Sequence, residues 1–89
     1  MNAEQIEEFV RRAPDYTPIL QKAVVHEEEN GTAPHYLGWE WYNVEAYPAR
    51  LMYLVVNGIA RVNFKSRRST CYLLKDREAT KEALKRLGY

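Results

Sequence analysis

The sequence contains a single cysteine, Cys71, among its 89 residues. One cysteine cannot form an internal disulfide, so we expect a reducing, cytoplasmic compartment. Long hydrophobic runs are also missing. The longest, Leu51–Val56, is far shorter than the roughly 20 apolar residues of a transmembrane helix, and we expect no membrane association. Because Glu4, Glu7 and Glu8 stand where a secretory signal would carry positive charge, we do not expect export.

Motifs for cofactors and catalysis are absent as well. The sequence has neither GxGxxG nor GxxxxGK[ST], so we expect no nucleotide cofactor. His26, His35 and Cys71 follow no zinc-ligand spacing, and Cys71 lies in a predicted strand where a small buried residue is expected. The adjacent carboxylates of 27–29 would point to different sides of a helix, which is unlike a catalytic pair. We therefore predict that the protein is not an enzyme and has no cofactor and no metal site.

Negative charge is missing from a long stretch of the sequence. Between Ala46 and Lys75 there are six basic residues and no acidic one. Residues 1–46 carry three basic and nine acidic side chains, whereas residues 47–89 carry ten basic and three acidic. This polarity is typical of a nucleic-acid footprint, although the net charge is only +1. The alternative is that the two halves attract each other or that the charges are simply solvated.

The N-terminal part of the sequence predicts two helices within a single domain over residues 1–89. Asn2 is expected to cap the first helix, with Gln5 as its reciprocal partner, and Ala13-Pro14 ends it. Thr17 is expected to cap the second helix, with Pro18 at its first position. The predicted buried face of that helix comprises Ile19, Leu20, Ala23 and Val24, its solvated end comprises Glu27, Glu28 and Glu29, and Asn30-Gly31 closes it.

The stretch from Thr32 to Tyr47 has a mixed pattern. Pro34 favours a short irregular helix over roughly 34–42, while Trp39-Glu40-Trp41 alternates like a strand and Gly38 weakens a helix. Aromatic residues are concentrated here, with five in twelve positions: Tyr36, Trp39, Trp41, Tyr42 and Tyr47. We expect most of them in the core, with one or two exposed for stacking on a base or for a protein partner.

The C-terminal part predicts a helix, a hairpin and a last helix. Pro48 opens a helix over 48–57 that Asn57-Gly58 ends. Ile59 to Lys65 alternates as a strand, with Ala60, Val62 and Phe64 on one face, residues 66–69 form the turn, and 70–74 return as the partner strand. Asp76 is expected to cap the last helix, which Gly88 ends.

These features together resemble a known family. Leu51, Leu54, Asn57-Gly58-Ile59, Lys65-Ser66-Arg67-Arg68-Ser69, Tyr72 and Leu74 are similar to the recognition helix and wing of small prokaryotic winged-helix regulators of the ArsR and MarR type. The resemblance covers residues 47–74. It implies an α+β, mainly helical fold: a winged helix-turn-helix with a two-stranded wing hairpin and a C-terminal helix. The cysteine and histidine ligand sets of metal-sensing relatives are missing.

The resemblance also implies double-stranded DNA as the partner and a role in transcription regulation. The helix over 48–57 would lie in the major groove, where Arg50 could bind a guanine edge. The 65–69 wing would neutralise phosphates. The implied nucleic-acid-binding residues are Ala49, Arg50, Tyr53, Asn57, Arg61, Lys65, Ser66, Arg67 and Arg68.

A short recognition helix contacts few base pairs, so we expect a dimer. Its candidate surface is the stripe of the last helix, Ala79, Ala83, Leu84 and Leu87, unless that stripe packs on its own core. The first helix is the other candidate. The alternative function is a winged-helix protein–protein interaction module within a larger assembly, docking through the aromatic residues and the acidic half. RNA or ribosome association is a third hypothesis.

Overall fold

Helix α1 (Ala3–Arg12) begins at a reciprocal cap in this computed structural model, which describes residues 2–89. The Gln5 backbone N–H donates to the Asn2 side chain over 3.0 Å, and the Asn2 N–H donates to the Gln5 side chain over 2.9 Å. This cap was predicted from the sequence and is confirmed. The helix ends at Ala13, before Pro14, as expected.

A 3₁₀ turn, η1 (Pro14–Tyr16), runs directly into helix α2 (Thr17–Asn30). The prediction that Thr17 caps α2 is wrong. The chain is already helical at Tyr16, so Thr17 lies inside the continuous helical run rather than at its boundary. Its hydroxyl is buried and has no hydrogen-bond partner among residues 2–89.

Glu27, in the last turns of α2, was expected in solvent but is only 5% exposed. Its Oε2 accepts hydrogen bonds from the indole Nε1 of Trp39 (2.9 Å) and from the backbone N–H of Leu74 (2.7 Å). Arg77 Nη1 lies 3.8 Å from Oε1. Position 27 follows Ala23 by four residues and therefore shares its buried face. The run of three glutamates concealed this periodicity.

The helix expected over roughly 34–42 is wrong. Residues 32–38 form turns and irregular backbone, and Trp39 pairs with Tyr72 through two backbone hydrogen bonds of 2.9 Å each. Gly38 has a φ of +128°, and a Cβ there would lie 2.2 Å from the Tyr72 carbonyl oxygen. Only glycine fits this approach. The strand-like alternation of residues 39–41 is thus matched at Trp39 alone, since Trp41 already begins a helix.

Two helices follow the Trp39 bridge. Helix α3 (Trp41–Val44) ends at Glu45, whose φ is +55°, and helix α4 (Pro48–Val56) begins with proline as predicted. Leu51 and Leu54 are fully buried, and Gly58 has a positive φ of 75° just after the helix. The predicted helix and its Asn-Gly stop are confirmed.

The hairpin consists of antiparallel strands β1 (Ala60–Lys65) and β2 (Thr70–Leu74). A bulge between Val62 and Phe64 corrects the predicted alternation. Val62 pairs with Tyr72, whereas Phe64 pairs with Cys71. Because paired residues share a face and successive residues alternate, Phe64 lies on the face opposite Val62 rather than beside it.

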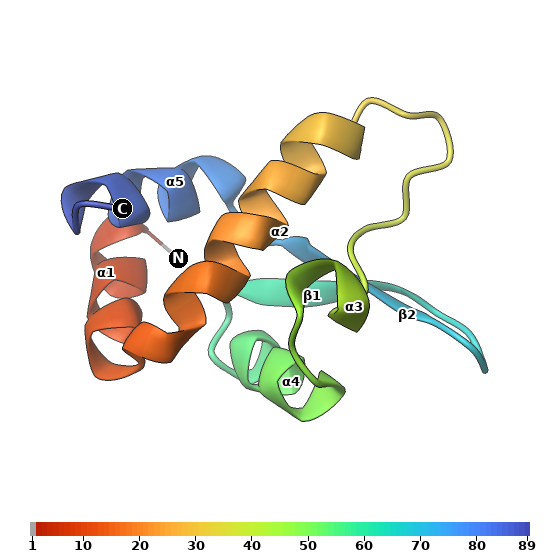
Figure 1. Ribbon diagram of the computed structural model, residues 1–89, viewed down its shortest axis with the longest axis horizontal. Coiled ribbons are helices and arrows are strands. Elements are labelled where there is room, and N and C mark those ends of the chain that lie inside the picture. Colours follow the sequence, from red (N-terminus) through yellow and green to blue (C-terminus); the bar gives the residue numbers. More distant parts are fainter. Residues whose placement is uncertain (1) are drawn as a thin grey trace.

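Helix α5 (Arg77–Arg86) is capped by Asp76, whose side chain accepts from the Ala79 N–H over 2.9 Å. It packs beside α1 on one side of α2, while the hairpin extends away from the other side (Figure 1). The fold is α+β and mainly helical, with a two-stranded hairpin and a C-terminal helix. None of the helices in residues 2–89 has the length and apolar character to cross a membrane.

The stripe of α5 lies inside the monomer. Ala83 and Leu84 are buried, and Ala79 and Leu87 pack partly buried against the same core. These side chains therefore have their partners within the chain, which removes the surface on which the expected α5 dimer depended.

Candidate nucleic-acid interface

The tip of the hairpin is closed by its own hydrogen bonds. Ser66 Oγ accepts from the backbone N–H groups of Arg68 (3.3 Å) and Ser69 (3.1 Å), and the Ser66 N–H donates to the Ser69 carbonyl over 2.8 Å. Ser66 was expected to contact nucleic acid, but its hydroxyl oxygen is engaged in holding the turn. The side chains of Arg67 and Arg68 stand outside this network.

Three cations gather at this tip: Lys65, Arg67 and Arg68 are exposed, and none forms an ion pair within residues 2–89. Arg61 lies further down β1, where its Nη1 donates to Asn63 Oδ1 over 2.7 Å. Asn63 in turn donates to the carbonyl of Leu37 over 2.8 Å. Arg61 is therefore held along the strand and separated from the tip.

The tip faces a concavity of about 280 Å³, here named the basic hollow. Its lining residues are Glu40, Trp41, Pro48, Lys65, Ser66, Arg67, Arg68, Ser69, Thr70 and Tyr72. The bulge in β1 explains why Lys65 belongs to it. Lys65 pairs with Thr70, two residues from Tyr72, so it lies on the Tyr72 face. The hairpin tip and the N-terminus of α4 thus open onto the same concavity.

An acid also lines the basic hollow. Glu40 Oε2 accepts a hydrogen bond of 2.6 Å from the Tyr42 hydroxyl. This bond raises the pKa of the Tyr42 phenol. The positive surface is therefore interrupted by one carboxylate, against three unpaired cations.

Arg50, the expected base-reading residue of α4, is bound within the chain. Its guanidinium forms an ion pair with Asp15 and lies over the Tyr16 ring, with Cζ 4.6 Å from the ring centroid. The Tyr16 hydroxyl also donates to the Arg50 carbonyl over 3.1 Å. These contacts fasten the start of α4 to η1, so base contact by Arg50 would require breaking them.

The other polar residues expected to contact DNA from α4 also make contacts within the chain. Tyr53 packs its ring against Phe9 and Tyr16, at centroid distances of 5.7 and 5.6 Å. The Asn57 amide donates to the Tyr53 carbonyl over 2.8 Å and so closes the helix end. The exposed side of α4 is a stripe at i, i+3, i+4 and i+7, comprising Ala49, Met52, Tyr53 and Val56.

A second concavity, of about 380 Å³, lies between α3 and the start of α4 and is here named the aromatic hollow. Its lining residues are Trp41, Tyr42, Glu45, Ala46 and Tyr47. The rings of Trp41 and Tyr47 are nearly parallel, at 17°, with centroids 6.4 Å apart. Trp41 lines both hollows, so the two adjoin the same side chain.

The sequence predicted that one or two of the clustered aromatics would be exposed for a partner, but it did not predict this hollow. Most of the five clustered aromatics were expected in the core, yet Trp41, Tyr42 and Tyr47 are all exposed, and Tyr47 is 75% exposed. Trp39 alone of the five is fully buried. The signal in the sequence was the excess of aromatics over the needs of one buried face, but it did not identify which of them face solvent.

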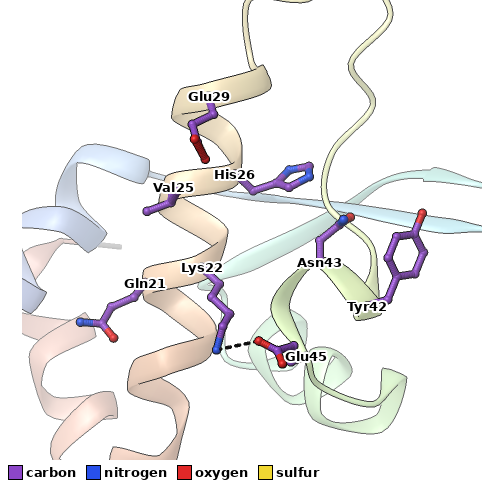
Figure 2. A pocket seen from close by; sticks show the side chains of 8 residues that line it. All are labelled: Gln21, Lys22, Val25, His26, Glu29, Tyr42, Asn43 and Glu45. Carbon is purple, nitrogen blue, oxygen red and sulfur yellow. Dashed lines mark ion pairs between the residues drawn. The ribbon is translucent and has the colours of Figure 1, made fainter.

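A third hollow, of about 510 Å³, separates α2 from the end of α3. Figure 2 shows α2 on one side and Tyr42, Asn43 and Glu45 on the other, joined by an ion pair of 3.1 Å between Lys22 and Glu45. Its charged lining is mixed and its ion pair is satisfied internally. We therefore assign no ligand to this hollow.

Of the residues considered for metal binding or nucleophilic chemistry, His26 is hydrogen-bonded, Cys71 is buried and His35 is exposed. His26 Nδ1 is hydrogen-bonded to the Tyr36 hydroxyl over 2.8 Å. Burial, and then the nearby Glu27 carboxylate, raise the pKa of Tyr36 to about 12. Cys71 is buried in β2, and burial raises the pKa of its thiol. Within the described residues, no three His, Cys, Asp or Glu side chains are arranged to hold a metal ion.

Comparisons with known proteins identify no relative of this chain. No protein-family model matches the chain, and neither the curated proteins nor the solved structures include a significant match.

Proposed function

We propose that the protein is a winged helix-turn-helix module that binds double-stranded DNA mainly through its phosphates. The hairpin would act as the wing and α4 as the helix nearest the groove. The order of elements supports this: α3, a short turn and α4 are followed at once by the β1–β2 hairpin. The Trp39 bridge to β2 joins the start of this helix pair to the hairpin.

The observation that carries the proposal is the set of three exposed cations at the hairpin tip, Lys65, Arg67 and Arg68, for which the described chain supplies no acid partner. Like charges gathered at a projecting tip repel one another, and a polyanion removes that cost. The N-terminus of α4 opens onto the same basic hollow, and its backbone dipole also favours negative charge.

Sequence reading would be weak on this proposal. In the exposed stripe of α4, Ala49, Met52 and Val56 cannot hydrogen-bond to a base edge, and Tyr53 is the one member whose side chain can. Arg50 is engaged with Asp15. We therefore expect an architectural or backbone-tracking role, and selection from random duplexes should enrich no strong motif.

Duplex affinity measured by fluorescence anisotropy over a series of salt concentrations tests the proposal. The double variant Arg67→Ala/Arg68→Ala should weaken binding and reduce the slope of log K against log salt by about 1.8, because each phosphate that is no longer neutralised accounts for ~0.9. Its matched control is Arg12→Ala/Lys85→Ala. That variant removes two exposed cations without ion pairs from α1 and α5, on the side of α2 away from the hairpin (Figure 1).

The control should bind as the unchanged protein does. Equal losses of affinity in both double variants would mean diffuse attraction rather than a wing contact. Absence of duplex binding at low salt would reject the proposal outright.

A protein-docking function is the second candidate, favoured by the apolar stripe of α4. Val56 is 77% exposed and Met52 45%, although single exposed apolar residues are common on soluble proteins. Substituting both by glutamate should abolish capture of a protein partner while leaving phosphate contacts at the hairpin tip intact. A defined partner lost in that variant, together with no duplex binding, would establish this function in place of DNA binding.

A further inference from the structure

We propose that the aromatic hollow holds an unpaired nucleotide base, so that the preferred ligand is a DNA duplex with a single-stranded overhang. The inference rests on the proposed DNA binding and names the form of DNA that the surface fits. It concerns Trp41 and Tyr47, two of the five clustered aromatics of which the sequence predicted that one or two would be exposed for stacking on a base or for a protein partner.

The exposed rings are costly to leave in water. Trp41 is 47% exposed and Tyr47 75% exposed, although the core accepts Trp39 completely. Aromatic rings contribute large burial energies when they are covered. These two exposed and nearly parallel rings therefore form a platform on which a flat apolar group would be stabilised.

The geometry of the ring pair suits a nucleotide base. The two rings lie within 17° of parallel, and the hollow that they border measures about 380 Å³. Nucleic-acid bases are flat and stack on aromatic side chains whatever their sequence. A base in a continuous duplex is already stacked on its neighbours, so the platform would favour one that lies outside the duplex.

Positive charge lies next to the platform. The basic hollow shares Trp41 with the aromatic hollow, and Lys65, Arg67 and Arg68 line it. A nucleotide presents a phosphate next to its base, so one strand could place phosphates at the hairpin tip and a base on the platform. Glu45 lines the aromatic hollow as well, but its carboxylate is paired with Lys22 at 3.1 Å.

Together the rings and the cations favour nucleic acid over a protein partner. An apolar protein surface would match the aromatic hollow alone and would leave the adjacent cations uncompensated. A single strand alternates flat rings with negative charge, which corresponds to both hollows at once.

The experiment compares a blunt duplex with the same duplex carrying a short thymidine overhang. We expect the overhang to raise affinity about 10-fold, which is within the range of base–aromatic stacking. Trp41→Ala and Tyr47→Ala should each remove most of that preference. Tyr47→Ala, which alters a residue that lines the aromatic hollow but not the basic hollow, should leave blunt-duplex affinity nearly unchanged. Tyr89→Ala, which alters an exposed aromatic residue outside both hollows, is the matched control and should change neither value.

Fluorescence supplies a readout that affinity alone does not. Trp39 is buried and Trp41 is exposed, so acrylamide should quench mainly Trp41. Bound overhang DNA should protect that residue, whereas blunt duplex should not. Circular dichroism of each variant confirms that the fold is retained.

The possible results separate the two proposals. Equal binding of blunt and overhang DNA, with no effect of Trp41→Ala, overturns this inference and leaves the proposed DNA binding standing. No binding of either DNA rejects both. Self-association in sedimentation that Trp41→Ala abolishes, without overhang preference, would assign the aromatic hollow to a second copy of the chain and also overturn the inference.

Discussion

Most of the positive charges on the helices are paired with acids, whereas none of those at the hairpin tip is paired within residues 2–89. On α5, Arg86 lies 3.3 Å from Glu7 and Lys81 lies 2.5 Å from Glu28, so cations of the basic half meet acids of the acidic half. Arg50 does the same with Asp15. At the hairpin tip, Lys65, Arg67 and Arg68 have no such partner within residues 2–89.

The basic side chains of this protein therefore fall into two populations. One is internal: the two halves attract each other across the fold, as one hypothesis from the sequence held. The other remains available at the surface. Only the second population supports an argument about a polyanionic partner.

Glu27 is the most buried acidic residue among residues 2–89, so its removal should give the largest loss of stability. Glu27→Ala should lower the free energy of unfolding by about 3 kcal/mol, because it leaves the Trp39 indole N–H and the Leu74 N–H without an acceptor. Urea unfolding followed by circular dichroism measures the change.

Two controls accompany Glu27→Ala. Glu27→Gln keeps a carbonyl oxygen for both donors and should lose less stability. Glu28→Ala, at the exposed neighbouring position, removes only a surface ion pair with Lys81 and should lose least. A loss at Glu28 equal to that at Glu27 would contradict the structural role assigned to the buried carboxylate.

Arg50 tests whether a cation that is paired within the chain also contributes to DNA binding. Arg50→Ala should cost about 1 kcal/mol of stability, from the ion pair with Asp15 and the contact with the Tyr16 ring. Duplex affinity should change much less than in Arg67→Ala/Arg68→Ala. The matched variant Asp15→Asn breaks the ion pair and keeps the arginine. A large loss of DNA affinity in Arg50→Ala alone would restore the base-reading role.

Thr17→Val should change the protein least. Because the Thr17 hydroxyl is buried without a partner among the described residues, replacing it with a methyl group should change stability by no more than about 0.5 kcal/mol, and toward stabilisation. A true helix cap would lose ~1 kcal/mol instead. Thermal unfolding of the variant beside the unchanged protein distinguishes the two.

Local signals predicted much of the fold. The Asn2–Gln5 cap, Pro48 at the start of α4, and Asp76 at the start of α5 each act within one helical turn. Such short-range chemistry can be read without knowing the rest of the structure. The turn over residues 66–69 was equally local.

The errors arose where distant residues decide the outcome. Glu27 is buried because Trp39 and the β2 backbone supply its partners, and neither is near it in the sequence. Residues 32–38 are not helical because Trp39 pairs with Tyr72. The bulge in β1 likewise depends on the pairing of the two strands, which the alternation of β1 alone does not encode.

The candidate site was predictable in part for the same reason. Lys65, Arg67 and Arg68 lie at a turn, so their exposure followed from local pattern. The ion pair between Arg50 and Asp15 could not be predicted in this way, because the two residues are 35 positions apart in the sequence. The aromatic hollow could not be predicted, because the sequence does not show which of the clustered aromatic residues are buried and which are exposed.

Gly38 limits how this chain can vary. Any side chain there would meet the Tyr72 carbonyl oxygen at 2.2 Å and would force the neighbouring Trp39–Tyr72 pairing to open. That opening would also break the hydrogen bond from the Trp39 indole to Glu27. A substitution in a loop would therefore leave a buried carboxylate with one hydrogen-bond donor fewer. Among residues 32–38, Gly38 should therefore be the position that tolerates substitution least.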